Sequence, residues 1–343
     1  HHHHHHHHHH YRRQHTTLFR HGYDDVVVQS LFKTGDLDSA IRLLRKLSTA
    51  APDDTYLALL KVCIKRKSLR QAKEVYDHIR SHGVTLRGFL ADYLVVTLAK
   101  CGAIEDAFRI FKSLQRHTMF SWNAIISSSV DFGHSEEALV LFESMMIDCN
   151  QVEPDSYTYV SLFKACGNTI NAMVGRKLHA VVCMEGYSSD AFVVSTLISM
   201  YGKVGQVLEA ELVFMSLPQH NVVSWNALIG GYAEYGHGDK AIHLFEEMQL
   251  KGVSPDAVTF ICTLKACGSI GAIAKGEEIH AQVSKRGLLK KDYIVGGALV
   301  NMYAKCGLFT RAREVLDMLP RRDVVSWTAL ISGYADQGHG GEA

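Results

Sequence analysis

The sequence lacks the features that mark several protein classes. Its 343 residues contain no run of 18 consecutive apolar residues, which excludes a transmembrane helix. None of its eight cysteines forms a C-x-x-C pair, which fits a reduced intracellular setting rather than a disulfide framework or a zinc ribbon. Glycine-rich phosphate loops, G-x-S-x-G elbows and H-E-x-x-H helices are missing too. The sequence therefore predicts no enzyme, no cofactor or metal, no membrane contact and no small-molecule substrate.

The chain also lacks an excess of charge of either sign. Lys plus Arg is 36 and Asp plus Glu is 35, so any polyanionic partner must be held by locally placed cations. The composition is 47% hydrophobic and 21% charged, which is enough to bury a large core. Residues 1–10 are all His, typical of a purification tag, and residues 11–21 form a short lead-in.

Internal repetition organises the rest of the sequence. Residues 222–238 match residues 324–340 at 13 of 17 positions, and MFSWNAIISSSVDFGHS at 119 is a further copy. Two other segment types recur at a similar distance: SYTYVSLFKACG as AVTFICTLKACG, and AFVVSTLISMYGKVG as YIVGGALVNMYAKCG. A large period of about a hundred residues therefore contains three smaller units.

Aligning the copies divides the chain into units of about 35 residues. They are 22–52, 53–87, 88–118, 119–155, 156–190, 191–221, 222–256, 257–292, 293–323 and 324–343. The last one stops at Ala343, which aligns with Ala241 at the opening of a second helix. We therefore expect this chain to be part of a longer protein.

Each unit has the apolar spacing of two helices. In the unit 222–256 the positions i, i+3, i+4 and i+7 are apolar twice: Trp225, Leu228, Ile229 and Tyr232, then Ala241, Leu244, Phe245 and Met248. Gly236 and His237 are placed to form the turn between them. A single hairpin cannot cover its own apolar stripes, so neighbours must stack. The predicted fold is all-α, an α-solenoid of stacked helix-turn-helix repeats.

These units resemble pentatricopeptide repeats, in the plant arrangement that cycles through P, L and S types. The strings that carry the resemblance are SWNALIGGYAEYG and AIHLFEEMQLKGVSPD (P), LKACGSIGAIAKGEEIHAQVSKRG (L) and NMYAKCGLFTRAREVLDMLPRRD (S). Residues 22–343 are covered, with L units at 53, 156 and 257, S units at 88, 191 and 293, and P units at 119, 222 and 324. Tetratricopeptide repeats form a similar hairpin but lack the three-type alternation. The resemblance implies a right-handed superhelix.

The resemblance also implies a function. Such proteins bind single-stranded RNA with one repeat facing one base, and those of this type guide C-to-U editing in chloroplasts or mitochondria. Their L repeats dock editing cofactor proteins, and catalytic or extension domains follow the repeats. Two alternatives stay open: a factor for splicing, stability or translation of a transcript, and a protein-binding scaffold. The H-x-E string at residues 134–136 resembles half of a zinc deaminase motif, but its P-C-x-x-C partner is absent.

The fifth and last residues of each unit are the candidate base-reading pair. Asn226 lies one 100° step off the apolar stripe through Trp225, and its amide offers a donor and an acceptor. Asp256 closes the unit beside the next helix. The alternative is that Asn226 is solvated on a helix surface and Asp256 only caps a helix. Between the units at 222 and 324 the fifth residue changes to Thr328 while the apolar scaffold is kept, which favours a readout position.

By resemblance to the family's code, each pair implies a base. Uracil, with cytosine second, is implied for Asn123 with Asp155 and for Asn226 with Asp256, adenine for Ser195 with Asn221, and a purine for Thr328. Four pairs depart from the code or are read poorly: Gly297 with Asp323, Asp92 with Thr118, Val160 with Asp190, and Ile261 with Asp292. From the unit at 119 onward, the predicted 5′ to 3′ core is pyrimidine, any, A, pyrimidine, any, any, purine.

Two further sets of residues have a candidate role in RNA binding. Five units carry an apolar residue at the second place, and in the family such residues sandwich each base: Phe120, Phe192, Val223, Ile294 and Val325. Ordinary packing between hairpins is the alternative. The thirteenth place of three units carries a cation suited to a phosphate: Lys100, Lys203 and Lys305. Acidic residues interrupt this track in the P units, at Asp131, Glu234 and Asp336, so a solvated helix surface is the rival interpretation.

Cysteine and histidine are phased with the repeat, which predicts a packing role for them. Cys63, Cys166 and Cys267 share the eleventh place of their units, and His179 and His280 lie on second helices. We therefore expect core or half-buried positions rather than metal ligands.

Overall fold

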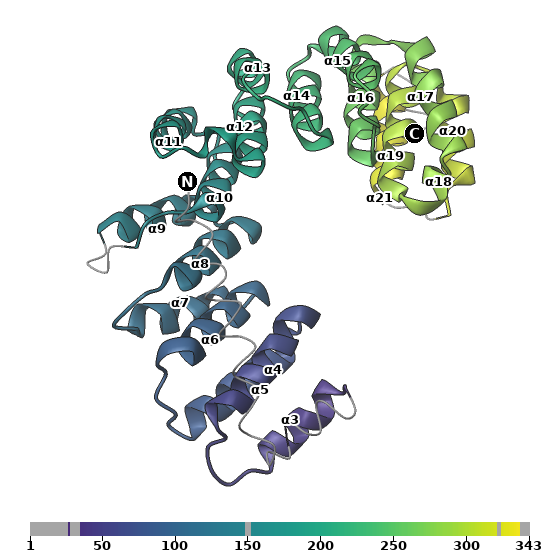
Figure 1. Cartoon of the computed structure of the whole chain (residues 1–343). Helices are drawn as coiled ribbons and strands as arrows, with labels where there is room; N and C mark the ends of the chain where they lie inside the picture. Colours follow the sequence, from purple (N-terminus) through teal and green to yellow (C-terminus); the bar gives the residue numbers. More distant parts are fainter. Residues whose placement is uncertain (1–26, 28–34, 148–151, 321–323, 337–343) are drawn as a thin grey trace. The chain divides into compact units, whose positions relative to one another are not determined.

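A computed structural model describes residue 27 and residues 35–147, 152–320 and 324–336, and every regular element in these ranges is helical (Figure 1). Residues 1–154 and 155–343 form two compact bodies, which are described separately as the N-terminal body and the C-terminal body. Within the described ranges, no helix combines the length and the apolar character that crossing a bilayer requires.

The helices alternate between the first and second helix of a hairpin. The N-terminal body contains α3 (Leu37–Arg45), α4 (Asp53–Arg66), α5 (Leu69–Ser81), α6 (Gly88–Lys100), α7 (Ile104–Ser113), α8 (Met119–Asp131) and α9 (Ser135–Ile147). The first six hairpin helices of the C-terminal body are α10 (Ser156–Asn168), α11 (Ala172–Met184), α12 (Ala191–Lys203), α13 (Val207–Met215), α14 (Val222–Glu234) and α15 (Gly238–Leu250). It continues with α16 (Ala257–Ile270), α17 (Ile273–Lys285), α19 (Tyr293–Lys305), α20 (Phe309–Met318) and α21 (Val324–Asp336), and also holds the short helices η1 (Tyr187–Ser189) and α18 (Leu288–Lys291).

First helices stack on one another in an unbroken row within each body. α4, α6 and α8 contact in succession, and so do α10, α12, α14, α16, α19 and α21. From α5 onward, each second helix packs on the first helix of its own hairpin. The predicted α-solenoid of stacked hairpins is therefore confirmed.

The difference between first and second helices follows from this stacking. A first helix has neighbours on several sides, so α12 buries residues around most of its circumference, among them Val194, Leu197 and Met200. The second helix α13 buries only a stripe, which includes Ala210 and Phe214. Apolar residues cover most of a helix only where neighbouring helices remove them from water.

Turns and caps set where each helix begins. Gly236 has φ of 79°, a left-handed conformation that glycine adopts without strain, and α15 begins two residues later. Asn221 and Asp256 cap α14 and α16 through a reciprocal capping box with Ser224 and Thr259. The last residue of one hairpin thus fixes the start of the next helix.

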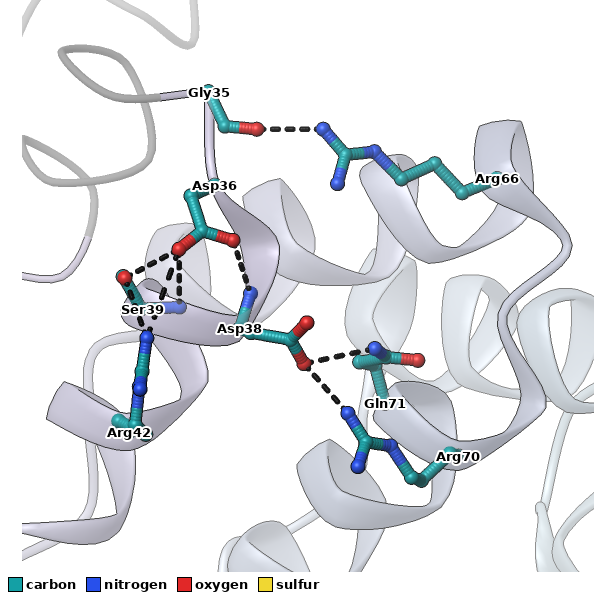
Figure 2. A network of polar contacts seen from close by, with 8 residues as sticks. All are labelled: Gly35, Asp36, Asp38, Ser39, Arg42, Arg66, Arg70 and Gln71. Atoms are coloured by element: carbon teal, nitrogen blue, oxygen red, sulfur yellow. Dashed lines mark hydrogen bonds and ion pairs between the residues drawn. The ribbon is translucent and has the colours of Figure 1, made fainter.

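Polar contacts tie the first described helix to the following hairpin (Figure 2). The carboxylate of Asp38 in α3 accepts hydrogen bonds from Arg70 Nη2 at 2.8 Å and Gln71 Nε2 at 2.9 Å, both from α5. Arg66, at the end of α4, donates to the carbonyl oxygen of Gly35. These contacts are exposed, so each contributes only about 0 to 1 kcal/mol, and burial of Leu37 and Leu44 dominates here.

Candidate nucleic-acid interface

The fifth and last residues of the unit 222–256 meet in the structure. Asn226 Nδ2 donates a hydrogen bond to Asp256 Oδ1 at 2.9 Å, and the side chain of Asn226 is only 9% exposed. Thr259 completes the group, because its hydroxyl donates to Asn226 Oδ1 at 2.6 Å. Asp256 also caps α16, accepting from the Thr259 backbone N–H at 2.9 Å. We call Asn226, Asp256 and Thr259 the 226 slot.

The 226 slot keeps hydrogen-bonding capacity after these contacts are made. The Asn226 amide has two N–H groups and two carbonyl lone pairs, and one of each is used. Burial by itself would raise the pKa of the Asp256 carboxyl, but the hydrogen bonds from Thr259 and Asn226 together hold that pKa below its ordinary value. The carboxylate therefore stays ionised and holds the amide, which offers one donor and one acceptor to a ligand.

Asp92 and Thr118 form a second slot of the same construction, in the N-terminal body. Asp92 is buried, and its carboxyl is hydrogen-bonded by the side chains of Thr118 and Ser121. Burial raises the pKa of Asp92 despite these hydrogen bonds. This pair departs from the family's code, yet the structure brings its two residues together as it does Asn226 and Asp256.

Ser195 and Asn221 are arranged differently. The Ser195 hydroxyl is buried, with the residue 5% exposed, and it has no hydrogen-bond partner among the described residues. Asn221 caps α14 by accepting from the Ser224 N–H at 2.9 Å. A buried hydroxyl without a partner is costly, which distinguishes this slot from the hydrogen-bonded slot of Asn226.

The remaining predicted pairs are described only in part. At Gly297 an added Cβ would lie 3.2 Å from Ser326 Oγ, so the following unit approaches the place that a side chain would fill. Thr328 is exposed and donates to the Val324 carbonyl of its own helix at 2.6 Å. Asp323 and the side chain of Val325 lie outside the described residues.

Asn123 and Asp155 belong to different bodies, and each is described within its own. Asn123 is half-buried on α8. Asp155 caps α10 by accepting from the Thr158 N–H at 3.0 Å, the same capping contact that Asp256 makes with Thr259.

The units at 156 and 257 have an apolar fifth residue. Val160 and Ile261 occupy the fifth place, and both are half-buried. Asp190 and Asp292 occupy the last place and cap α12 and α19 through backbone N–H groups. These two carboxylates act on the helix start and face no polar fifth residue.

Apolar side chains at the second place are exposed, which is unusual for residues of this kind. Phe192 is 80% exposed, Val223 55% and Ile294 52%. Phe120 is half-buried and lies 5.5 Å, centroid to centroid, from the ring of Tyr93. The alternative interpretation is that these residues pack between hairpins. Neighbouring hairpins leave about half or more of Phe192, Val223 and Ile294 exposed, so their surfaces are accessible for stacking.

Sequence reasoning missed further members of this row. Phe89, Tyr157 and Val258 also occupy the second place of their units and are exposed at 41%, 64% and 51%. The signal was present, because the same register identifies them. They extend the row of exposed apolar residues to the units at 88, 156 and 257.

The three lysines of the thirteenth place are exposed, and one of them has a polar contact. Lys203 Nζ donates to Asn168 Oδ1 at 3.2 Å, and its stem lies over Gly167. Lys305 lies over Gly268 in the same way, and Lys100 is exposed at the end of α6. The acidic residue of this place in α14, Glu234, forms an ion pair with Lys265 of α16. That pairing cancels one of the charges that interrupt the cationic track.

The cysteines and histidines lie where repeat packing places them. Cys63, Cys166 and Cys267 are fully buried, and burial raises the pKa of Cys166 to about 11. His179 and His280 are half-buried, each with Nδ1 2.9 Å from a tyrosine hydroxyl of the next first helix. Among the residues that the structure describes, no three His, Cys, Asp or Glu side chains are grouped as around a metal ion.

Comparison with known proteins identifies the repeat. A PPR repeat family profile matches residues 117–168 and 220–269, and a PPR repeat profile matches residues 54–84, 192–222, 297–324 and 325–343. The chain is 38% identical over 325 residues to the pentatricopeptide repeat-containing protein CRR2, chloroplastic, of Arabidopsis thaliana, covering 92% of this chain and 49% of that protein. It is 31% identical to a putative mitochondrial pentatricopeptide repeat-containing protein of the same plant, covering 92% and 50%. The chain thus spans about half the length of these relatives.

Solved structures show the same architecture. Maize PPR10 has a TM-score of 0.63 at 19% identity, covering 92% of this chain and 51% of that chain. PPR10 in complex with an 18-nt psaJ RNA element has a TM-score of 0.65 at 19% identity, covering 90% and 52%. At this level of identity the likeness establishes the fold, and function has to be argued from the slots themselves.

Proposed function

Because this chain belongs to the pentatricopeptide repeat family, we propose that it binds single-stranded RNA sequence-specifically, with the fifth and last residues of each unit facing one base. The observation that carries the proposal is the 226 slot. Asn226 and Asp256 come from opposite ends of one unit, yet their side chains are joined at 2.9 Å. With the contact from Thr259, this leaves one N–H and one lone pair of the amide for a base edge.

The exposed second-place row supports the same proposal. An extended strand needs both an edge to pair with and a face to stack on, and aromatic stacking contributes about 1 to 3 kcal/mol per base. Phe192 offers an aromatic face three residues before Ser195, and Ile294 offers an exposed aliphatic surface three residues before Gly297. Lysines at the thirteenth place then supply phosphate contacts that the near-neutral total charge does not provide.

We propose further that the chain is of the P, L and S type and directs C-to-U editing of a transcript in a chloroplast or mitochondrion. The three-type alternation of the units supports this, as do the relatives named chloroplastic and mitochondrial. In this proposal the repeats position an editing activity that other segments or partner proteins supply, with the units at 53, 156 and 257 docking them. The chain itself performs binding and no catalytic step.

Selection from a random pool tests the RNA proposal. The chain is mixed with randomised single-stranded RNA at moderate salt, and retained molecules are sequenced through successive rounds. We expect enrichment of a pyrimidine, any, A, pyrimidine, any, any, purine core. If no RNA is enriched, a protein-binding scaffold explains the array better. Expression of the protein in a plant line that lacks it, followed by transcript sequencing, separates editing from splicing or stability.

A further inference from the structure

The 226 slot contains a third residue that the fifth-and-last pairing does not include. Thr259 is the third residue of the following unit, and it is completely buried. Its hydroxyl lies 2.6 Å from Asn226 Oδ1 and 3.0 Å from Asp256 Oδ1, and it accepts from the Asp256 N–H at 3.0 Å. A hydroxyl has one proton, and the shorter contact assigns that proton to Asn226.

The amide of Asn226 is therefore held at both ends. Asp256 accepts from its nitrogen and Thr259 donates to its oxygen. A 180° flip of the amide would place its oxygen against the Asp256 carboxylate, two acceptors facing each other. It would also turn the amide N–H groups toward Thr259, whose proton would have to leave the 2.6 Å contact for the longer one, at 3.0 Å, with Asp256 Oδ1. The contact with Asp256 opposes the flip directly, and the short contact with the buried Thr259 hydroxyl favours the present orientation.

Amide orientation matters because uracil and cytosine present opposite patterns to it. On the Watson–Crick edge uracil has an acceptor at O4 beside a donor at N3, whereas cytosine has a donor at N4 beside an acceptor at N3. An amide held in one orientation matches one of these patterns and mismatches the other, while an amide free to flip matches both.

The same third-place hydroxyl recurs in other slots. Ser121 hydrogen-bonds the carboxyl of Asp92, and Ser326 Oγ lies 3.2 Å from the Cβ position of Gly297. After the units whose fifth residue is apolar, the third place is apolar as well, as in Val193 and Val295. Hydroxyls therefore occur after units whose fifth residue is polar or glycine and are absent where the fifth residue is aliphatic.

We propose that Thr259 is a positioning residue for base recognition, which locks the Asn226 amide in one orientation and so sets the discrimination between uracil and cytosine at this slot. The inference rests on the proposed RNA binding. It extends the reading unit from two residues to three, with the third contributed by the next repeat.

The test uses two RNAs of the predicted core that differ only in the fourth nucleotide, U or C. Equilibrium binding is measured for the full chain and for Thr259→Val, which removes the hydroxyl and copies Val193 and Val295. We expect the U-to-C affinity ratio of Thr259→Val to move toward one by about three-fold or more, the net worth of one hydrogen bond. Thr259→Ser keeps the hydroxyl and restores the ratio.

Thr263→Val is the matched control for loss of a buried hydroxyl. Thr263 lies on the same helix, is completely buried, and donates only to the Thr259 carbonyl at 2.8 Å. It should leave the ratio unchanged. An unchanged ratio in Thr259→Val, with a melting temperature like that of Thr263→Val, overturns the lock. A wild-type chain that binds RNA with no preference at the fourth nucleotide overturns the proposed register instead, which distinguishes the two failures.

Discussion

Gly202 of α12 and Gly231 of α14 lie against each other, so that a Cβ added to Gly202 would be 3.0 Å from the Cα of Gly231. The Cα of Gly231 is a backbone atom, so it cannot avoid the added Cβ by a change of rotamer. Neither residue needs a left-handed conformation, since both lie within helices. Glycine is required here for close approach between two first helices of the row.

Gly202→Ala should therefore destabilise the C-terminal body. Separating α12 from α14 to admit a methyl group costs about 1 to 3 kcal/mol, and the gain in helix propensity of about 1 kcal/mol offsets only the lower end of that range. Urea unfolding followed by circular dichroism measures the change. Gly230→Ala is the matched control, because its nearest neighbour is the Cys262 Sγ at 3.3 Å, a side-chain atom that can move. Equal stability of Gly202→Ala and wild type would contradict the close contact.

Asp92→Asn should stabilise the N-terminal body at neutral pH. Burial raises the pKa of Asp92, so the folded state disfavours its charge, and wild-type stability falls as pH rises from the ordinary carboxyl pKa through the raised one. Asparagine is neutral throughout and still accepts from Thr118 and Ser121. The gain in unfolding free energy, on the order of 1 kcal/mol at pH 7, should vanish near pH 4, where Asp92 is itself protonated.

Thermal melts at a series of pH values measure this difference. Asp77→Asn serves as the control, since Asp77 is exposed and, among the residues that the structure describes, pairs only with Arg80 of the same helix. It should shift stability little at any pH. If the wild-type protein is more stable than Asp92→Asn at pH 7, the folded state stabilises the ionised carboxylate. That result would contradict a raised pKa for Asp92.

Most of the fold was predictable from the sequence because the repeat supplies several copies of each pattern. Apolar spacing at i, i+3, i+4 and i+7 around Trp225 and Phe245 predicted both helices of the hairpin, and the structure confirms them. Residues of the second place were harder to assign. Whether an apolar residue such as Phe192 is covered depends on how closely neighbouring hairpins approach, which spacing within one unit does not encode.

The composition of the slots was only half predictable. Sequence treated capping and amide contact as alternatives for Asp256, and the structure shows that one carboxylate oxygen does both. A carboxylate has several lone-pair sites, so the two roles do not compete. Thr259 was missed because it belongs to the next unit, 33 residues from Asn226. Contacts across a repeat boundary appear only once the stacking geometry is known.

Exchanging the 226 slot for the arrangement of Ser195 and Asn221 should change the base it prefers. Asn226→Ser together with Asp256→Asn gives a short hydroxyl at the fifth place and keeps a good cap for α16, since asparagine caps helices as well as aspartate. We expect preference at the fourth nucleotide of the core to move from pyrimidine toward adenine. Binding to four RNAs that differ only there measures the change, and the third nucleotide serves as the internal control. Unchanged preference among the four bases would discard the register.

Lys203→Ala and Lys305→Ala should weaken RNA binding equally for all sequences. Both side chains are exposed at the ends of first helices, over Gly167 and Gly268, and neither belongs to a slot. A phosphate contact releases counterions, and for single strands each contact contributes about 0.7 to the slope of log affinity against log salt. Each substitution should lower that slope by about this amount, and the double variant by about twice as much. Titrations at four salt concentrations determine the slopes.

Lys285→Ala provides the comparison for charge alone. Lys285 is exposed at the end of α17, which is a second helix. Its replacement by alanine removes the same charge from the C-terminal body and leaves the row of first helices unchanged. A specific phosphate contact predicts a smaller slope for Lys203→Ala than for Lys285→Ala, with U-to-C and pyrimidine-to-adenine ratios unchanged in both. Identical slopes for the two variants would mean that the lysines act only through the general field of the protein, as solvated side chains of a helix surface do.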